Sequence, residues 1–202
     1  MTMAPPIVVG ITGASGAPYA VRLLQQLTAA HRSVSLIVSK YGMRLLETEA
    51  GISTIDALRS AVGKEAWDSC VKTFANDDRG AAPASGSALT SGMIVCPCSM
   101  GTLSAIAAGS SRSLIERAAD VTLKERRKLI LVPRETPLSA IHLANMLRLT
   151  RAGAVIMAAA PGFYHQPKQI SDLVDFVVAR MLDQLNVPHQ LVKRWEGENQ
   201  TS

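Results

Sequence analysis

The sequence contains little that would cross-link the chain or hold a metal ion. Its 202 residues include only three cysteines, and an odd number in a chain without an export signal argues against a disulfide framework. Cys96 and Cys98 form a single C-x-C pair and the four histidines are scattered, so the four ligands of a structural zinc site are missing. We therefore expect no bound metal ion.

Long hydrophobic runs and aromatic residues are also scarce. No segment reaches the roughly 18 consecutive apolar residues of a membrane span, although 48% of the residues are hydrophobic. Aromatic residues make up 4% of the chain, so aliphatic side chains must fill the core. Residues 1–6 lack the basic start and the long apolar stretch of a signal peptide. We expect a cytoplasmic protein without a membrane span.

The charges form no concentrated patch in the sequence. The formal net charge of +5 leaves a nucleic acid and a small anionic ligand as alternatives. Lysines and arginines are dispersed, and no basic run carries interleaved aromatic residues, so we expect a small anion and no nucleic acid. The G-x-S-x-G, H-E-x-x-H and P-loop motifs are all missing, which removes the reaction classes that depend on them.

Short apolar runs alternate with helical patterns along the chain. This alternation predicts one α/β domain, residues 1–202, with a mainly parallel sheet and helices on both faces. Residues 52–92 are the least regular part, and residues 186–202 form a polar tail that we expect at a surface or subunit interface. The expected strands are 7–11, 34–38, 71–74, 93–97, 129–132 and 154–157. The expected helices are 18–30, 41–50, a short helix ending at 59, a helix ending at 108, 113–126, 139–151 and 170–185.

The first strand runs into a glycine-rich turn with the spacing G-x-x-G-x-x-G, formed by Gly10, Gly13 and Gly16. Pro18 suits the first turn of the following helix, and the free N–H groups there form an anion site. The dinucleotide fingerprint is G-x-G-x-x-G with an acid after the second strand, but here the second strand is followed by Ser39-Lys40. A single phosphate is therefore favoured over a dinucleotide. The alternative is a tight turn without a ligand.

The fourth expected strand repeats this arrangement, because 93–97 leads into a small polar turn, 98–102, and then a helix. Two such turns in one sheet flank a crevice at the carboxyl edge of the strands, where open α/β sheets bind ligands. Polar groups follow four strands in all. They are Ser15, Ser39, Ser99 with Thr102, and Arg134 with Glu135. The alternatives are ordinary N-capping for the hydroxyls and, for Arg134, a salt bridge to Glu135 or Glu125.

Other segments carry candidate groups outside these turns. Residues 84–87 form either a second anion-binding turn or a plain surface loop, and the aromatic loop 162–167 forms either a lid or part of the core. Arg180 interrupts an apolar helix, either to reach an anion or to extend toward water. Glu49 ends a helix where a carboxylate opposes the dipole, so we expect another benefit there.

Seven motifs occur in order along the chain. They are Gly10–Gly16, Val38–Lys40, Ala84–Ser87, Cys96–Thr102, Glu116–Arg127, Val132–Pro137 and Pro161–Pro167. Together they closely resemble the UbiX family, the flavin prenyltransferases that were once named aromatic-acid decarboxylases. The resemblance covers essentially the whole chain, and only residues 52–83 lack a clear match.

The resemblance implies a flavodoxin-like or Rossmann-like three-layer fold, a homododecamer and FMN as cofactor. The residues that it implies for FMN are Gly13, Ala14, Ser15, Ser39, Ser99, Met100, Gly101, Thr102 and Arg134. Those that it implies for dimethylallyl phosphate are Ser87, Arg117, Lys124, Glu135, Tyr164 and Arg180. The catalytic residues that it implies are Ser15, Glu49, Lys124 and Glu135.

The implied reaction joins the dimethylallyl group of dimethylallyl phosphate to N5 and C6 of reduced FMN without a metal ion. The product, prenylated FMN, would serve a UbiD-type decarboxylase, as in ubiquinone biosynthesis. One alternative is a flavin-dependent decarboxylase of the peptidyl-cysteine type, but those enzymes use a histidine in mid-chain, and none lies here between His31 and His142. The other is an FMN carrier, which would not need Lys124 or Arg180.

Overall fold

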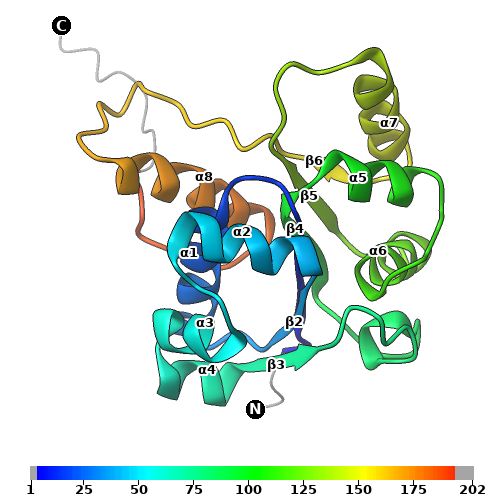
Figure 1. The fold of residues 1–202 in the computed structure, drawn as a ribbon, viewed down its shortest axis with the longest axis horizontal. Helices are drawn as coiled ribbons and strands as arrows, with labels where there is room; N and C mark the ends of the chain where they lie inside the picture. Colours follow the sequence, from blue (N-terminus) through cyan, green and yellow to red (C-terminus); the bar gives the residue numbers. More distant parts are fainter. Residues whose placement is uncertain (1–3, 194–202) are drawn as a thin grey trace, which may run out of the picture.

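The computed structural model describes residues 4–193 and shows a six-stranded sheet between two layers of helices (Figure 1). The strand order is β3-β2-β1-β4-β5-β6, and every pair is parallel. This order is doubly wound, with its switch point between β1 and β4. The strands are β1 Ile7–Ile11, β2 Val34–Val38, β3 Val71–Phe74, β4 Gly92–Cys98, β5 Leu129–Pro133 and β6 Val155–Ile156. The predicted three-layer α/β fold is confirmed.

The helices divide between the two faces of the sheet. Those on one face include α1, α3, α4 and α8, and those on the other are α5, α6 and α7 (Figure 1). Their bounds are α1 Ala17–Ala29, α2 Lys40–Ala50, α3 Ile55–Val62, α4 Lys64–Cys70, α5 Met100–Ala107, α6 Leu114–Lys124, α7 Ala140–Arg151 and α8 Ile170–Gln184, with a short 3₁₀ turn at Ala82–Ala84. Among residues 4–193, no helix is both long and apolar enough to cross a membrane.

The alternation of side chains along β1 builds a separate core on each face. Ile7, Val9 and Ile11 pack into the layer of α1 and α8, whereas Val8 packs into the layer of α5 and α6. Both faces are covered, which explains why the strands are apolar throughout. A Cβ at Gly10 would lie 3.3 Å from Ile115 on α6. Glycine at this position therefore brings α6 close to the sheet.

The structure differs from the expected elements mainly between β2 and β4. Helix α4 was not expected, because its seven residues contain one large apolar side chain and hence no helical periodicity. That side chain, Trp67, is buried among the residues of the α1 layer, so tertiary packing stabilises the helix. Strand β6 covers two residues rather than the expected four. The prediction for the tail falls partly outside the described residues, but within residues 186–193 Val187 is buried against the core.

Candidate functional site

The segments that follow β1, β2 and β4 lie at the carboxyl edge of the sheet, and α1, α2 and α5 begin there. We call these segments the rim. Ser39 Oγ accepts the N–H of Gly42 at 3.0 Å, and Ser99 Oγ accepts the N–H of Thr102 at 3.3 Å. Both serines are thus N-caps, as the alternative prediction held. Three helix N-termini at one edge still create a positive potential there.

The buried side chain of Thr12 ties the turns after β1 and β4 together. Its Oγ1 donates to the carbonyl of Pro97 at 2.8 Å and accepts the N–H of Ser99 at 2.8 Å. Its own N–H donates to the same carbonyl at 3.2 Å. Sequence reasoning did not single out Thr12, because its partners lie 85 and 87 residues away. A hydroxyl between a buried strand and a glycine was the only local signal.

Glu49, at the end of α2, accepts hydrogen bonds from the first turn of α1. Its Oε2 lies 2.8 Å from both the Gly16 and the Ala17 backbone nitrogens. The carboxylate therefore occupies the anion site that the glycine-rich turn predicts, and the favourable dipole is that of α1. This contact supplies the benefit that the unfavourable position on α2 led us to expect.

The environment of Glu49 stabilises its charged form. Burial alone would raise the pKa of Glu49, but hydrogen bonds from the two backbone N–H groups and the Ser15 side chain outweigh that effect. The positive charge of Arg134 acts in the same direction, so the pKa of Glu49 lies below its ordinary value. Near neutral pH the rim therefore holds a carboxylate beside a guanidinium.

Arg134, just after β5, reaches the rim from its other side. Its Nε donates to the carbonyl of Ser15 at 3.4 Å. Glu125 pairs with Lys124, and Glu135 Oε1 accepts the N–H of Thr136 at 3.2 Å. Within residues 4–193 no ion pair joins Arg134 to Glu135 or Glu125. The guanidinium is directed to the rim, as a ligand-binding role requires.

The glycines of the rim show where neighbouring residues pack closely and where the surface is open to a ligand. A Cβ at Gly13 would lie 2.5 Å from the Cβ of Tyr41, so glycine lets α2 approach the turn closely. A Cβ at Gly101, on the first turn of α5, would meet nothing within 4 Å. The rim thus offers an open surface at α5, helix N-termini and a guanidinium. These features fit the phosphate and the flat ring of a flavin mononucleotide.

The predicted donor-binding residues Ser87 and Lys124 lie near the opposite, amino edge of the sheet. Lys124 ends α6 just before β5, and Ser87 precedes β4. A Cβ at Gly86 would lie 2.8 Å from Lys124 Nζ, so this loop and α6 are in contact. Arg127, which sequence reasoning missed, fixes the loop by donating to the carbonyls of Gly86 and Ala88 at 2.7 and 2.8 Å.

Two further cations of this set are paired along their own helices. On α6, Arg117 Nη1 lies 2.7 Å from Asp120 Oδ2, which is the solvated arrangement of an i,i+3 ion pair. On α8, Arg180 Nη1 lies 2.9 Å from Asp183 Oδ2. The side chain of Arg180 is 58% exposed.

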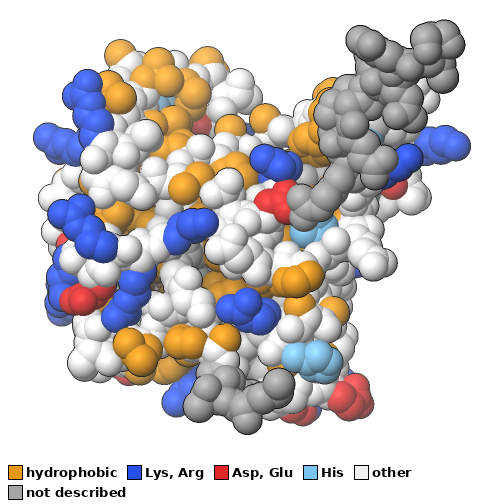
Figure 2. Space-filling view, turned by 180° about the vertical axis from the view of Figure 1, so that it is seen from behind, with side chains coloured by type: hydrophobic (Ala, Val, Ile, Leu, Met, Phe, Trp, Pro, Cys, Tyr) orange, Lys and Arg blue, Asp and Glu red, His pale blue; other side chains and the backbone are white. Residues whose placement is uncertain are grey.

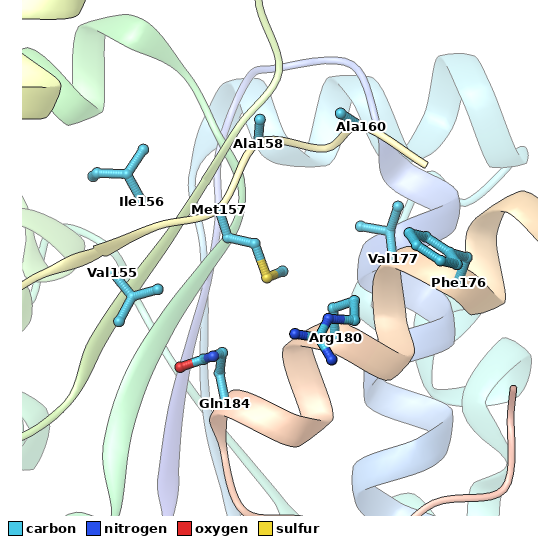
Figure 3. A pocket seen from close by; sticks show the side chains of 9 residues that line it. All are labelled: Val155, Ile156, Met157, Ala158, Ala160, Phe176, Val177, Arg180 and Gln184. Atoms are coloured by element: carbon cyan, nitrogen blue, oxygen red, sulfur yellow. The ribbon is translucent and has the colours of Figure 1, made fainter. Parts of the chain in front are cut away.

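Tyr164 and Arg180 gather around Phe176 of α8. The Tyr164 ring meets the Phe176 ring edge-on with centroids 5.6 Å apart, and His165 stacks on the same ring at 5.1 Å. Tyr164 is exposed, so the alternative that it belongs to the core is wrong. Arg180 lines a cavity of about 280 Å³ between α8 and the segment 155–160 (Figure 3). The predicted residues thus lie apart in one chain: the flavin set at the rim, Ser87 and Lys124 near the amino edge, and Tyr164 and Arg180 beside Phe176.

The cysteines do not belong to the reactive groups. Cys96 and Cys98 are fully buried in β4, and burial raises the pKa of both thiols, that of Cys98 to about 12. Neutral thiols are poor nucleophiles and poor metal ligands. Among residues 4–193, no group of three or more His, Cys, Asp or Glu side chains could hold a metal ion.

Sequence comparison identifies the family to which this architecture belongs. The Flavoprotein family model matches residues 1–182. Flavin prenyltransferase UbiX of Pseudomonas aeruginosa is 48% identical over 97% of this chain and 96% of its own length. The chain belongs to the UbiX family of flavin prenyltransferases.

Solved structures of UbiX-family proteins have the same fold. AnUbiX (PadA1) in complex with FMN and dimethylallyl pyrophosphate superposes with a TM-score of 0.89 at 42% identity, over 96% of this chain and 98% of that one. A dodecameric FMN-dependent UbiX-like decarboxylase from Escherichia coli O157:H7 superposes with a TM-score of 0.87 at 44% identity, over 95% of this chain and all of the other.

Proposed function

We propose that this chain transfers the dimethylallyl group of dimethylallyl phosphate to N5 and C6 of reduced FMN, releasing phosphate and prenylated FMN. The observation that carries the proposal is the rim, where three helix N-termini, Arg134 and Glu49 surround the open first turn of α5. AnUbiX, which has the same fold, binds both FMN and a dimethylallyl ester.

FMN, when bound in its reduced form, supplies the nitrogen and carbon nucleophiles of the reaction. Arg134 and the N-termini of α2 and α5 would bind its phosphate, because Glu49 already uses the first amides of α1. The residues that would line it are Gly13, Ala14, Ser15, Ser39, Ser99, Met100, Gly101 and Thr102. Glu49 is the proposed proton acceptor, and its lowered pKa keeps the carboxylate in the deprotonated form near neutral pH, with Ser15 as its hydrogen-bonded neighbour.

The leaving phosphate needs cations around it, since negative charge develops there as the carbon–oxygen bond breaks. Lys124, Arg117 and Arg180 supply such charges, and Ser87, Glu135 and Tyr164 complete the proposed set. Because these residues lie apart in one chain, we propose that neighbouring copies in a homododecamer bring them together. The dodecameric relative supports this arrangement.

The direct test is an anaerobic incubation of the protein with reduced FMN and dimethylallyl phosphate, followed by mass spectrometry of the flavin. With the wild-type chain the flavin is expected to gain the mass of one dimethylallyl group less one hydrogen, because a proton leaves the flavin as phosphate is released. Glu49→Gln keeps the shape but removes the charge, so it should slow transfer by about 100-fold, as expected for loss of a proton acceptor, while still binding FMN. An unchanged flavin mass with the wild-type chain would refute the proposed transfer.

The fate of the product forms a second part of the proposal. Prenylated FMN is passed to a UbiD-type decarboxylase in the cytoplasm. The family membership supports this role. Adding the reaction mixture to such a decarboxylase without its cofactor should restore decarboxylation, whereas a mixture made without dimethylallyl phosphate should not.

A further inference from the structure

Arg180 is the first member of a chain of three polar side chains. Its guanidinium donates to one oxygen of Asp183 at 2.9 Å, and the other oxygen of Asp183 lies 3.2 Å from Nε2 of His189. Exposure of the side chains falls along this chain, from 58% for Arg180 to 21% for Asp183 and 3% for His189. The inner end is therefore fixed in the protein, while the outer end faces solvent.

The hydrogen bonds of His189 assign its tautomer. Its Nδ1 accepts the N–H of Leu191 at 3.4 Å, so this nitrogen carries no proton. The proton of the neutral ring is then on Nε2, which donates to Asp183. Both ring nitrogens are used in this way, as expected for a buried polar group.

We propose that Asp183 and His189 are positioning residues that hold the Arg180 guanidinium ready for the phosphate of the prenyl donor. An unrestrained arginine loses about 2 kcal/mol of side-chain entropy when it is fixed. The Asp183–His189 pair removes part of that freedom in advance, which favours binding. The inference rests on the proposed function, because it takes the phosphate of that reaction as the ligand of Arg180.

Two features of the surroundings agree with this role. Figure 3 shows Arg180 and Gln184 on successive turns of α8, facing the cavity beside Val155 and Met157. The guanidinium thus lies beside the edge strand β6 while it stays paired with Asp183 on its own helix. The donation from His189 also draws negative charge of Asp183 away from Arg180, which leaves the guanidinium a better partner for an anion.

The test compares two substitutions of His189. His189→Leu removes the donor to Asp183, whereas His189→Gln retains an N–H near the position of Nε2. We expect His189→Leu to raise KM for dimethylallyl phosphate about tenfold, with kcat and KM for FMN within about twofold of wild type. His189→Gln should restore KM to within about twofold. Val187→Ala, in the same buried segment, controls for lost packing and should leave KM unchanged.

The role of Arg180 is tested by combining substitutions. In an Arg180→Met background, His189→Leu should not lower kcat/KM further, because the group that it positions is gone. The proposal is overturned if His189→Leu leaves KM for dimethylallyl phosphate unchanged, or if Val187→Ala or His189→Gln raises KM as much as His189→Leu does. It is also overturned if His189→Leu lowers kcat/KM as much in the Arg180→Met background as in the wild-type chain. If His189→Leu does not fold, His189→Phe, which keeps a ring in the buried position but removes the donor to Asp183, takes its place and should raise KM in the same way.

Failure of the proposed function is distinguished by a binding measurement. Calorimetric titration of the FMN-loaded protein with dimethylallyl phosphate reports the Kd without turnover. If the wild-type chain binds the ester but does not prenylate FMN, the proposed function fails. In that case, a tenfold weaker Kd in His189→Leu that His189→Gln restores still supports the positioning role of His189. A Kd in His189→Leu equal to that of the wild-type chain refutes it.

Discussion

Glu49 combines a structural contact with a proposed chemical role. It caps the first turn of α1 across 33 residues of sequence and lies in the field of Arg134. A charged acceptor bonded to two backbone N–H groups is worth more than a neutral one. The same interactions that stabilise the rim also keep this group deprotonated, so that folding and proton acceptance depend on one carboxylate.

The stability of the protein should therefore depend on pH through Glu49. Its pKa in the folded chain lies below the ordinary value of 4.5, so its stabilising effect is present above that value and is lost as the pH falls through the folded pKa. We expect Glu49→Gln to lower the free energy of unfolding by about 1–3 kcal/mol at neutral pH. In denaturant titrations the difference from wild type should disappear in acid, and a difference independent of pH would contradict this account.

At the level of elements, we expect a substitution in the first turn of α5 to have opposite effects on the stability of the protein and on its affinity for FMN. Gly101→Ala should stabilise the helix by about 0.5–1 kcal/mol, since alanine is the better helix former and its Cβ meets nothing in the chain. It should nevertheless weaken FMN binding about tenfold, because we propose that the flavin binds against this surface. Ser104→Ala, one turn further along the same exposed face and away from the N-terminus of α5, is the control and should leave FMN affinity unchanged. Thermal unfolding and flavin fluorescence measure the two effects.

The ion pair between Arg22 and Asp175 joins α1 to α8. It is bidentate, with distances of 2.6 and 3.0 Å, and both side chains are partly buried. We expect Arg22→Met to cost about 1 kcal/mol, which lowers Tm by about 2–4 °C in a chain of this size. Arg59→Met removes a more exposed pair between α3 and α4 and should have a smaller effect. Equal decreases in Tm for Arg22→Met and Arg59→Met would show that the α1–α8 ion pair stabilises the protein no more than the exposed pair does.

Sequence reasoning reached the local features of the rim and missed the distant ones. The serines at Ser39 and Ser99 were predictable because a capping hydroxyl acts on an N–H three residues away. The bond from Thr12 to Pro97 and the cap that Glu49 gives to α1 join residues far apart in the chain, and no local pattern encodes them. Helix α4 was missed for the same reason, because its stability comes from packing of Trp67.

In the whole molecule, α7 carries three exposed apolar side chains that suit the proposed assembly. Ile141, Leu143 and Leu147 are 71%, 53% and 51% exposed, and Figure 2 shows hydrophobic side chains gathered over this part of the surface. We expect Ile141→Glu to reduce the size of the assembly, measured by sedimentation velocity, and to lower activity with it. Ser60→Glu on α3 is the control. An assembly of unchanged size in Ile141→Glu would exclude Ile141 from the interface.

The separation of Lys124 from the rim has a consequence for mixed populations of chains. In the proposed assembly, a copy with a defective Lys124 would keep its own flavin cradle intact, and the centre that fails would belong to the neighbour that it serves. Activity of a mixture with normal chains should then fall in proportion to the altered chains. Mixing chains altered at Lys124 with chains altered at Arg134, each inactive alone, should restore activity, because some centres would combine a normal cradle with a normal Lys124.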